Sequence, residues 1–104
     1  MKRYGQIARL KPEKIEEYIE LHAAVWPEVL KILKTCNLSN YSIYIQGDIL
    51  FCYFEYLGDD YTADMAKMEG SELMQQWWRH TKPCFAGHEK EEYYVDLREI
   101  FHNQ

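Results

Sequence analysis

The sequence predicts an α+β fold, in which helices pack against one face of an antiparallel sheet. Residues 41–46 and 49–56 are rich in β-branched and aromatic side chains, and the pair Gly47-Asp48 between them is typical of a tight hairpin turn. Residues 13–35 carry apolar side chains at helical spacing, whereas residues 95–101 alternate apolar and polar side chains as a strand does. Both strands and helices are therefore expected.

The first half of the chain has clear element boundaries. Residues 3–10 are best interpreted as a strand, and Pro12 suits the first turn of the helix that follows. Pro27 should interrupt that helix, because a proline removes a backbone hydrogen bond and clashes with the preceding turn. We expect a break between His22 and Trp26, with Pro27 opening a second helical piece.

The second half completes the pattern. Residues 37–40 are polar and predict a turn before the hairpin, and residues 61–68 and 71–80 predict two helical segments. Residues 83–92 predict a charged loop, and residues 95–101 the last strand. The resulting order, β-α-β-β-α-β, is the ferredoxin-like pattern.

Composition limits the classes of function. The 104 residues (1–104) suit a single domain, and the net charge of −5 without a basic face argues against a nucleic-acid partner. No apolar run reaches membrane-spanning length, so no membrane association is expected. Cys36, Cys52 and Cys84 are odd in number and lack close-paired metal spacing. We therefore expect reduced thiols in a cytoplasmic protein.

A sheet covered by helices on one face only leaves its other face open. Tyr44, Phe51, Tyr53 and Phe101 would make that open face aromatic and adhesive. Pairing two such sheets across a two-fold axis would cover it, so the sequence predicts a homodimer.

A histidine lies within the apolar stripe of the first helical segment. One third of the helical wheel holds the following residues: Ile15, Tyr18, Ile19, His22, Trp26, Val29, Leu30 and Leu33. A buried imidazole needs a partner. His22 is either a core histidine bonded to a backbone carbonyl, or an acid or base that faces a pocket together with Tyr18.

A tryptophan pair is the second candidate for chemistry. Trp77 and Trp78 point about 100° apart on a helix, so both cannot face one core. One could pack inside while the other is covered by a dimer contact or a loop. Alternatively, an indole could present its flat face to a sugar ring. Tyr41, at the start of a strand, could border the same pocket, and the remaining histidines are too scattered to predict a metal site.

Taken together, several segments resemble the L-rhamnose mutarotase family over nearly the whole chain. These segments are Glu17-Tyr18 with His22, Trp26-Pro27-Glu28, Asn40-Tyr41-Ser42-Ile43-Tyr44, Gln76-Trp77-Trp78 and Leu97-Arg98-Glu99-Ile100-Phe101. The resemblance implies a dimeric α+β barrel and an isomerase of the aldose 1-epimerase type that interconverts the anomers of L-rhamnose without a metal or organic cofactor. It also implies that His22 is the proton donor and that Tyr18, Tyr41, Trp77 and Trp78 bind the sugar.

Residues 83–94 depart most from the family pattern, because they are unusually acidic and rich in tyrosine. If this segment borders the pocket, L-fucose or another 6-deoxy sugar is an alternative substrate. Two other functions remain open. A haem-degrading monooxygenase of the same barrel would use His22 as an iron ligand, and a non-catalytic dimeric binding domain would keep the pocket without the chemistry.

Overall fold

One antiparallel sheet organises the molecule. The computed structural model describes residues 1–104, and its sheet has the strand order β2-β3-β1-β4. The strands are β1 (Lys2–Arg9), β2 (Leu38–Gln46), β3 (Ile49–Tyr56) and β4 (Val95–Leu97). Because the first strand lies between the third and fourth, the topology is the predicted ferredoxin-like one, and the α+β class is confirmed.

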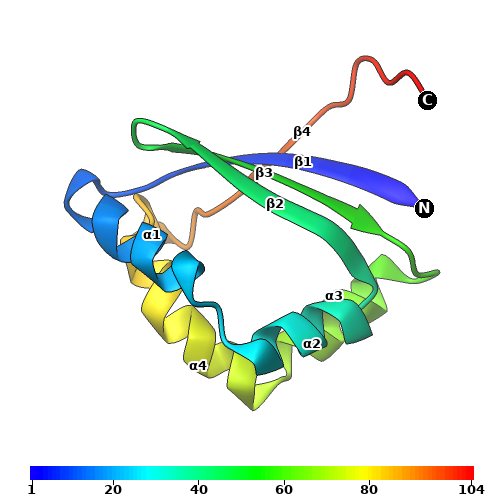
Figure 1. Cartoon of the computed structure of the whole chain (residues 1–104), viewed down its shortest axis with the longest axis horizontal. Coiled ribbons are helices and arrows are strands. Elements are labelled where there is room, and N and C mark those ends of the chain that lie inside the picture. The colour runs from blue at the N-terminus through cyan, green and yellow to red at the C-terminus, as the bar shows by residue number, and fades with distance from the viewer.

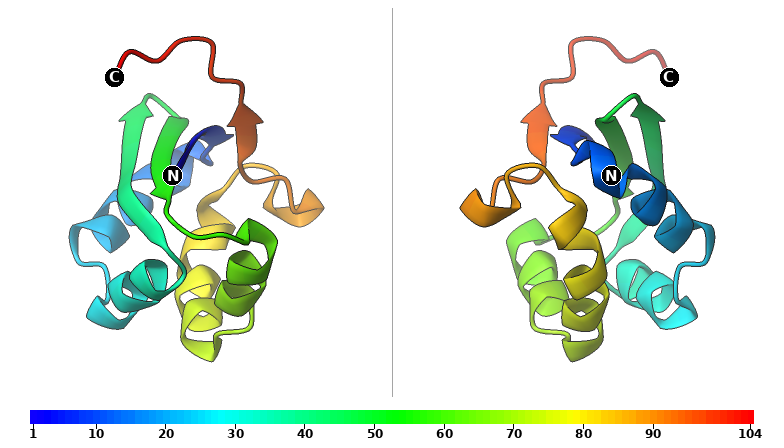
Figure 2. Two further views of the ribbon diagram at one scale, coloured as in Figure 1. Left: turned by 90° about the vertical axis from the view of Figure 1, so that its right-hand side faces the viewer. Right: turned by 90° about the vertical axis from the view of Figure 1, so that its left-hand side faces the viewer.

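The helices cover one face of this sheet. They are α1 (Ile15–Ala23), α2 (Pro27–Thr35), α3 (Tyr61–Glu69) and α4 (Glu72–Thr81), and the 3₁₀ turn η1 (Pro12–Lys14) precedes α1. Figure 1 shows all of the helices below the sheet and only the C-terminal tail above it, and the turned views in Figure 2 agree. The open upper face is therefore exposed in the single chain.

Pro27 breaks the first helical segment as predicted. Helix α1 ends at Ala23, four residues before the proline, where a continuing helix would bring the Pro27 ring against the Ala23 carbonyl. Trp26 adopts an extended conformation, with φ −60° and ψ 133°, as residues before proline prefer. His22 consequently lies in the last turn of α1.

The prediction of a single buried stripe along residues 15–33 is wrong for two of its residues. Ile19 is 43% exposed and Leu30 is 53% exposed. The break after Ala23 reorients α2 relative to α1, so one helical wheel does not describe both pieces.

Two strand boundaries also differ from the prediction. Residues 38–40 belong to β2 and not to a turn, because Leu38 and Ser39 pair with Tyr56 and Glu55 of β3. The strand is irregular here: Asn37 and Asn40 adopt positive φ values of 67° and 49°, and the register shifts between Ser39 and Ser42. Asparagine tolerates this left-handed conformation better than most residues. The polar composition of the segment therefore marks an irregular strand.

The last strand is shorter than predicted. β4 ends at Leu97, and residues 98–101 pair with no strand. Ile100 and Phe101 are more than four-fifths exposed, at 85% and 82%. An alternating pattern predicts which residues share a face, but it does not supply a partner strand.

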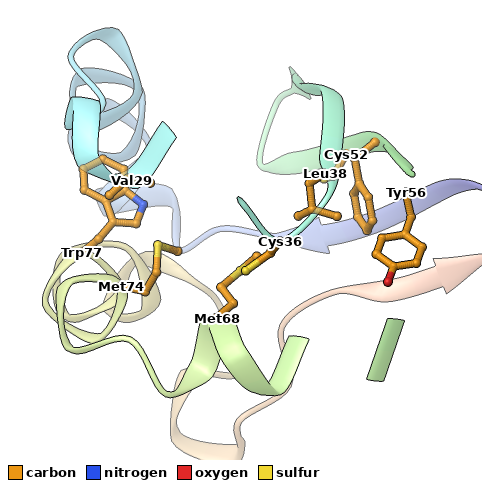
Figure 3. Close-up of a cluster of buried hydrophobic side chains, with 9 residues drawn as sticks. Val29, Cys36, Leu38, Cys52, Tyr56, Met68, Met74 and Trp77 are labelled. Carbon is orange, nitrogen blue, oxygen red and sulfur yellow. The ribbon is translucent and has the colours of Figure 1, made fainter. Parts of the chain in front are cut away.

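The core lies between the sheet and the helices and has two clusters. The larger cluster joins Val29, Cys36, Leu38, Cys52, Phe54, Tyr56, Met68, Met74 and Trp77, most of which are labelled in Figure 3. The smaller one joins Ala8, Leu10, Tyr18, Leu50, Cys84 and Phe85. Ile43 of β2 and Tyr94, which precedes β4, pack against both clusters. Residues of both clusters also line the cavity described below.

Candidate active site

A cavity of about 730 Å³ lies between the inner face of the sheet and the helices α1 to α4. Most of its lining is hydrophobic, as is usual for small-molecule sites. All of the site residues predicted from the sequence line it: Tyr18 and His22 from α1, Tyr41 from β2, and Trp77 and Trp78 from α4. The fold thus brings together residues that are up to 60 positions apart in the sequence.

One ring nitrogen of His22 is committed to the backbone. Its Nδ1 lies 2.9 Å from the carbonyl oxygen of Tyr18, one helical turn earlier. A carbonyl can only accept, so Nδ1–H is the donor and the neutral ring carries its free lone pair on Nε2. The interpretation of His22 as a histidine satisfied by a backbone carbonyl is therefore correct, but it accounts for only one of the two nitrogens.

Burial sets the charge state of this imidazole. Desolvation lowers the pKa of His22 below its ordinary value of 6.5, and the hydrogen bond to the Tyr18 carbonyl opposes this with a smaller effect. Since desolvation dominates, His22 is neutral at pH 7. The Nε2 lone pair is then ready to accept a proton.

Aromatic rings hold His22 on two sides. The Tyr18 ring stacks on it, with centroids 4.2 Å apart, and Trp77 meets it edge to face at 5.6 Å. Trp77 is itself 5% exposed and packs edge to face against Trp26 at 5.2 Å. Trp77 is thus a core residue as well as a cavity wall.

Trp78 occupies a more open position on the next residue of α4. It is half-buried, and the Lys82 ammonium lies 4.7 Å from the centre of its ring. The two indoles do diverge, as expected for neighbours on a helix, yet both reach the cavity.

Tyrosine hydroxyls contribute to the polar part of the cavity. The Tyr18 hydroxyl lies 3.2 Å from that of Tyr94, and burial raises the pKa of Tyr18 to about 12. Tyr41 stacks on Phe54 at 5.3 Å, and desolvation of its hydroxyl near Cys52 raises its pKa well above 10.0. These phenols therefore stay protonated at neutral pH and can both donate and accept hydrogen bonds.

Tyr94 is one of the cavity residues that sequence reasoning missed. It follows the charged segment 83–92 and directly precedes β4. The one signal was the bulky pair Tyr93-Tyr94 in otherwise charged sequence. Such a pair is more typical of residues that pack inward than of a solvated loop.

Neither a metal centre nor a membrane segment is evident in the structure. No group of three or more His, Cys, Asp or Glu side chains is placed to hold a metal ion. The helices are all too short or too polar to cross a bilayer.

Comparison with known proteins identifies the family. A family model described as L-rhamnose mutarotase matches residues 3–103. The chain belongs to the L-rhamnose mutarotase family. This confirms the resemblance found in the sequence. Within the family, the chain is similar to the L-rhamnose mutarotases of Oceanobacillus iheyensis, at 34% identity, and Listeria monocytogenes, at 33%, each over 98% of both chains.

A solved structure supports the fold of this family member. The crystal structure of an L-rhamnose mutarotase from Formosa agariphila superposes with a TM-score of 0.81 at 23% identity, covering 100% of both chains. At that identity the likeness concerns the fold, whereas the family assignment rests on the sequence matches.

Proposed function

We propose that the chain is an isomerase of the aldose 1-epimerase type, which interconverts the α and β anomers of L-rhamnose. The observation that carries this proposal is His22 with a free Nε2 on a cavity walled by aromatic rings and tyrosine hydroxyls. Membership of the mutarotase family gives the sugar: the relatives from two genera are named for L-rhamnose.

The reaction requires one proton to move between two oxygens. The anomeric hydroxyl loses its proton, the ring oxygen gains one, and the bond between C1 and the ring oxygen breaks to give an open-chain aldehyde. Rotation about the C1–C2 bond and closure by the reverse steps yield the other anomer. No electrons are exchanged with another molecule, so the chemistry needs only a proton carrier and a site that holds the sugar.

His22 is the proposed proton carrier. Because its pKa is lowered, the neutral ring first takes the proton of the anomeric hydroxyl on Nε2. The imidazolium formed then donates that proton to the ring oxygen, which gives His22 the donor role that the resemblance implies. The Nδ1–H bond to the Tyr18 carbonyl stabilises the charged intermediate state of the ring. The Tyr18 hydroxyl or a water molecule can complete the transfer when the two oxygens are not both within reach.

Trp77, Trp78, Tyr18 and Tyr41 are the proposed binding residues. A pyranose has an apolar C–H face, which suits contact with an indole ring, and hydroxyls at its rim, which suit the tyrosines. Trp78 is the better placed indole for this contact because Trp77 is largely enclosed by Trp26 and His22.

Anomer exchange is the direct test. With L-rhamnose, saturation-transfer NMR should show α/β exchange that increases in proportion to protein concentration, and exchange of L-fucose should be slower. Exchange at the buffer rate for every aldose tested would refute the proposal. Faster exchange of L-fucose would keep the activity and change the substrate. A shifted Soret band after haem addition, without anomer exchange, would instead favour the haem-binding alternative.

The open face of the sheet supports a homodimer, which is also part of the proposal. Tyr44 of β2 lies opposite Phe51 of β3. Phe51 lies opposite Ile7 of β1, which lies opposite Val95 of β4. This row crosses the whole sheet on the face without helices, and Tyr44, Phe51 and Val95 are all exposed. A second copy of the sheet would bury it, and three buried unpaired cysteines fit a cytoplasmic setting for such a dimer.

Placing a charge in this row should dissociate the dimer. Phe51→Lys puts an ammonium at the centre of the apolar row, and we expect the dimer dissociation constant to rise about 30-fold or more, as for a central interface residue. Light scattering during size-exclusion chromatography measures the mass. Ile19→Lys, which charges an exposed isoleucine on α1 instead, should stay dimeric. A wild-type protein that is monomeric at high concentration would contradict the dimer.

A further inference from the structure

Tyr94 enters the cavity from a segment that follows α4. After α4 the chain forms the 3₁₀ turns η2 (Lys82–Cys84) and η3 (His88–Lys90) before it returns to the sheet. Gly87, with φ 86°, turns the chain between them in a conformation that favours glycine. Tyr94 comes one residue before β4, so the sheet pairing of Val95 with Ile7 fixes its backbone.

The Tyr94 ring is held between the two halves of the core. It packs against both buried clusters, and it meets the Phe85 ring edge to face at 5.4 Å. A tyrosine anchored at its backbone and along its ring has little freedom to swing away. Its hydroxyl therefore has a defined place in the cavity.

That place is beside Tyr18. The two hydroxyl oxygens are 3.2 Å apart, and no other side chain or backbone group bonds either of them. In such a pair one hydroxyl donates and the other accepts, so one O–H and free lone pairs remain for a ligand. Desolvation raises the pKa of Tyr94 well above 10.0, with Tyr18 and Tyr41 adding to the effect, so the group stays neutral.

We propose that Tyr94 is a specificity-determining residue whose hydroxyl, paired with that of Tyr18, forms a subsite for a ring hydroxyl of the sugar. This inference rests on the proposed function for the identity of the sugar. It goes beyond the residues that the family resemblance carries over, because Tyr94 lies in segment 83–94, where the chain departs most from the family pattern.

The subsite has a consequence for substrate choice. Buried hydroxyls that are built to bond a substrate hydroxyl lose that bond when the substrate lacks the group or points it elsewhere, so they discriminate strongly. L-Rhamnose and L-fucose differ in the orientation of the hydroxyls at C2 and C4. If the contacted hydroxyl is the one at C2 or C4, the paired tyrosines favour one of these two sugars over the other.

The test combines one variant with three altered sugars. Tyr94→Phe keeps the ring, and its packing, while it removes the hydroxyl. We expect it to weaken binding of L-rhamnose about two- to tenfold, the effect of one neutral hydrogen bond. Binding is measured by titration of tryptophan fluorescence with L-rhamnose and its 2-deoxy, 3-deoxy and 4-deoxy analogues. For the analogue that lacks the contacted hydroxyl, wild type and Tyr94→Phe should bind equally well.

A matched control removes a phenolic hydroxyl on the other face of the sheet. Tyr53 donates to Glu55 at 2.7 Å and lies on the face without helices, so Tyr53→Phe should bind all four sugars as wild type does. Equal weakening of all four sugars by Tyr94→Phe, or no weakening, would overturn the subsite. A protein that shows the expected selective loss of binding but does not exchange anomers would uphold the subsite and refute the proposed activity.

Discussion

His22→Ala should reduce the rate of protein-catalysed anomer exchange of L-rhamnose by about 10²- to 10⁴-fold, the usual contribution of one acid–base group. The variant loses the only imidazole that lines the cavity, whereas the phenols there hold their protons too tightly to replace it. Saturation-transfer NMR measures the exchange, and circular dichroism checks that the fold is retained. Unchanged exchange would remove His22 from the mechanism.

The control for this variant is a histidine outside the cavity. His102 is exposed in the C-terminal tail, so His102→Ala should exchange anomers at the wild-type rate.

The pH profile of anomer exchange gives a second check on the role of His22. Since burial lowers the pKa of His22 below 6.5, the neutral base predominates above that value, and the rate should be level between pH 7 and 8. It should fall as the pH drops below the lowered pKa. A rate that increases towards acid pH would show that the imidazolium is the starting form.

Trp77→Ala should cost about 3–5 kcal/mol of unfolding free energy, the usual range for truncating a buried aromatic side chain. Trp77 is 5% exposed, belongs to the larger core cluster, and supports both Trp26 and His22. Such a loss is a large part of the stability of a small domain. Urea denaturation measures it.

The neighbouring tryptophan provides the matched comparison. Trp78 is only half-buried, so Trp78→Ala should cost clearly less stability than Trp77→Ala while it weakens sugar binding. If the two variants were equally unstable, the assignment of Trp77 to the core and Trp78 to the ligand would be wrong. Trp77→Phe retains most of the packing and allows sugar binding to be measured at that position as well.

Much of the fold could be predicted because the relevant signals are local. Pro27 acts on the residues just before it, and Asp60 and Ser71 accept hydrogen bonds from backbone amides of α3 and α4 at helix starts that the sequence marked. The length of β4 was mispredicted because strand pairing depends on a distant partner. The register of β4 against Gly5, Gln6 and Ile7 ends at Leu97, whereas its alternating pattern continues to Phe101.

The candidate site was less accessible to reasoning from residues alone. Spacing placed Tyr18 and His22 on one helix face, but it left open whether His22 was a core residue or faced a pocket. Both alternatives hold in part in the structure, because Nδ1 of His22 donates to the Tyr18 carbonyl and the residue also lines the cavity. Tyr94 lay beyond prediction because its place depends on how a charged segment returns to the sheet. No local pattern encodes that path.

The partner of His22 Nδ1 is a main-chain oxygen, and this separates two properties that active sites often couple. Every residue type at position 18 that keeps α1 helical presents the same carbonyl, so the tautomer of His22 does not depend on the side chain there. Mutation can therefore alter the Tyr18 side chain, and with it the sugar contacts, while leaving the proton carrier in place. Substrate preference can then change within such a family while the catalytic step stays the same.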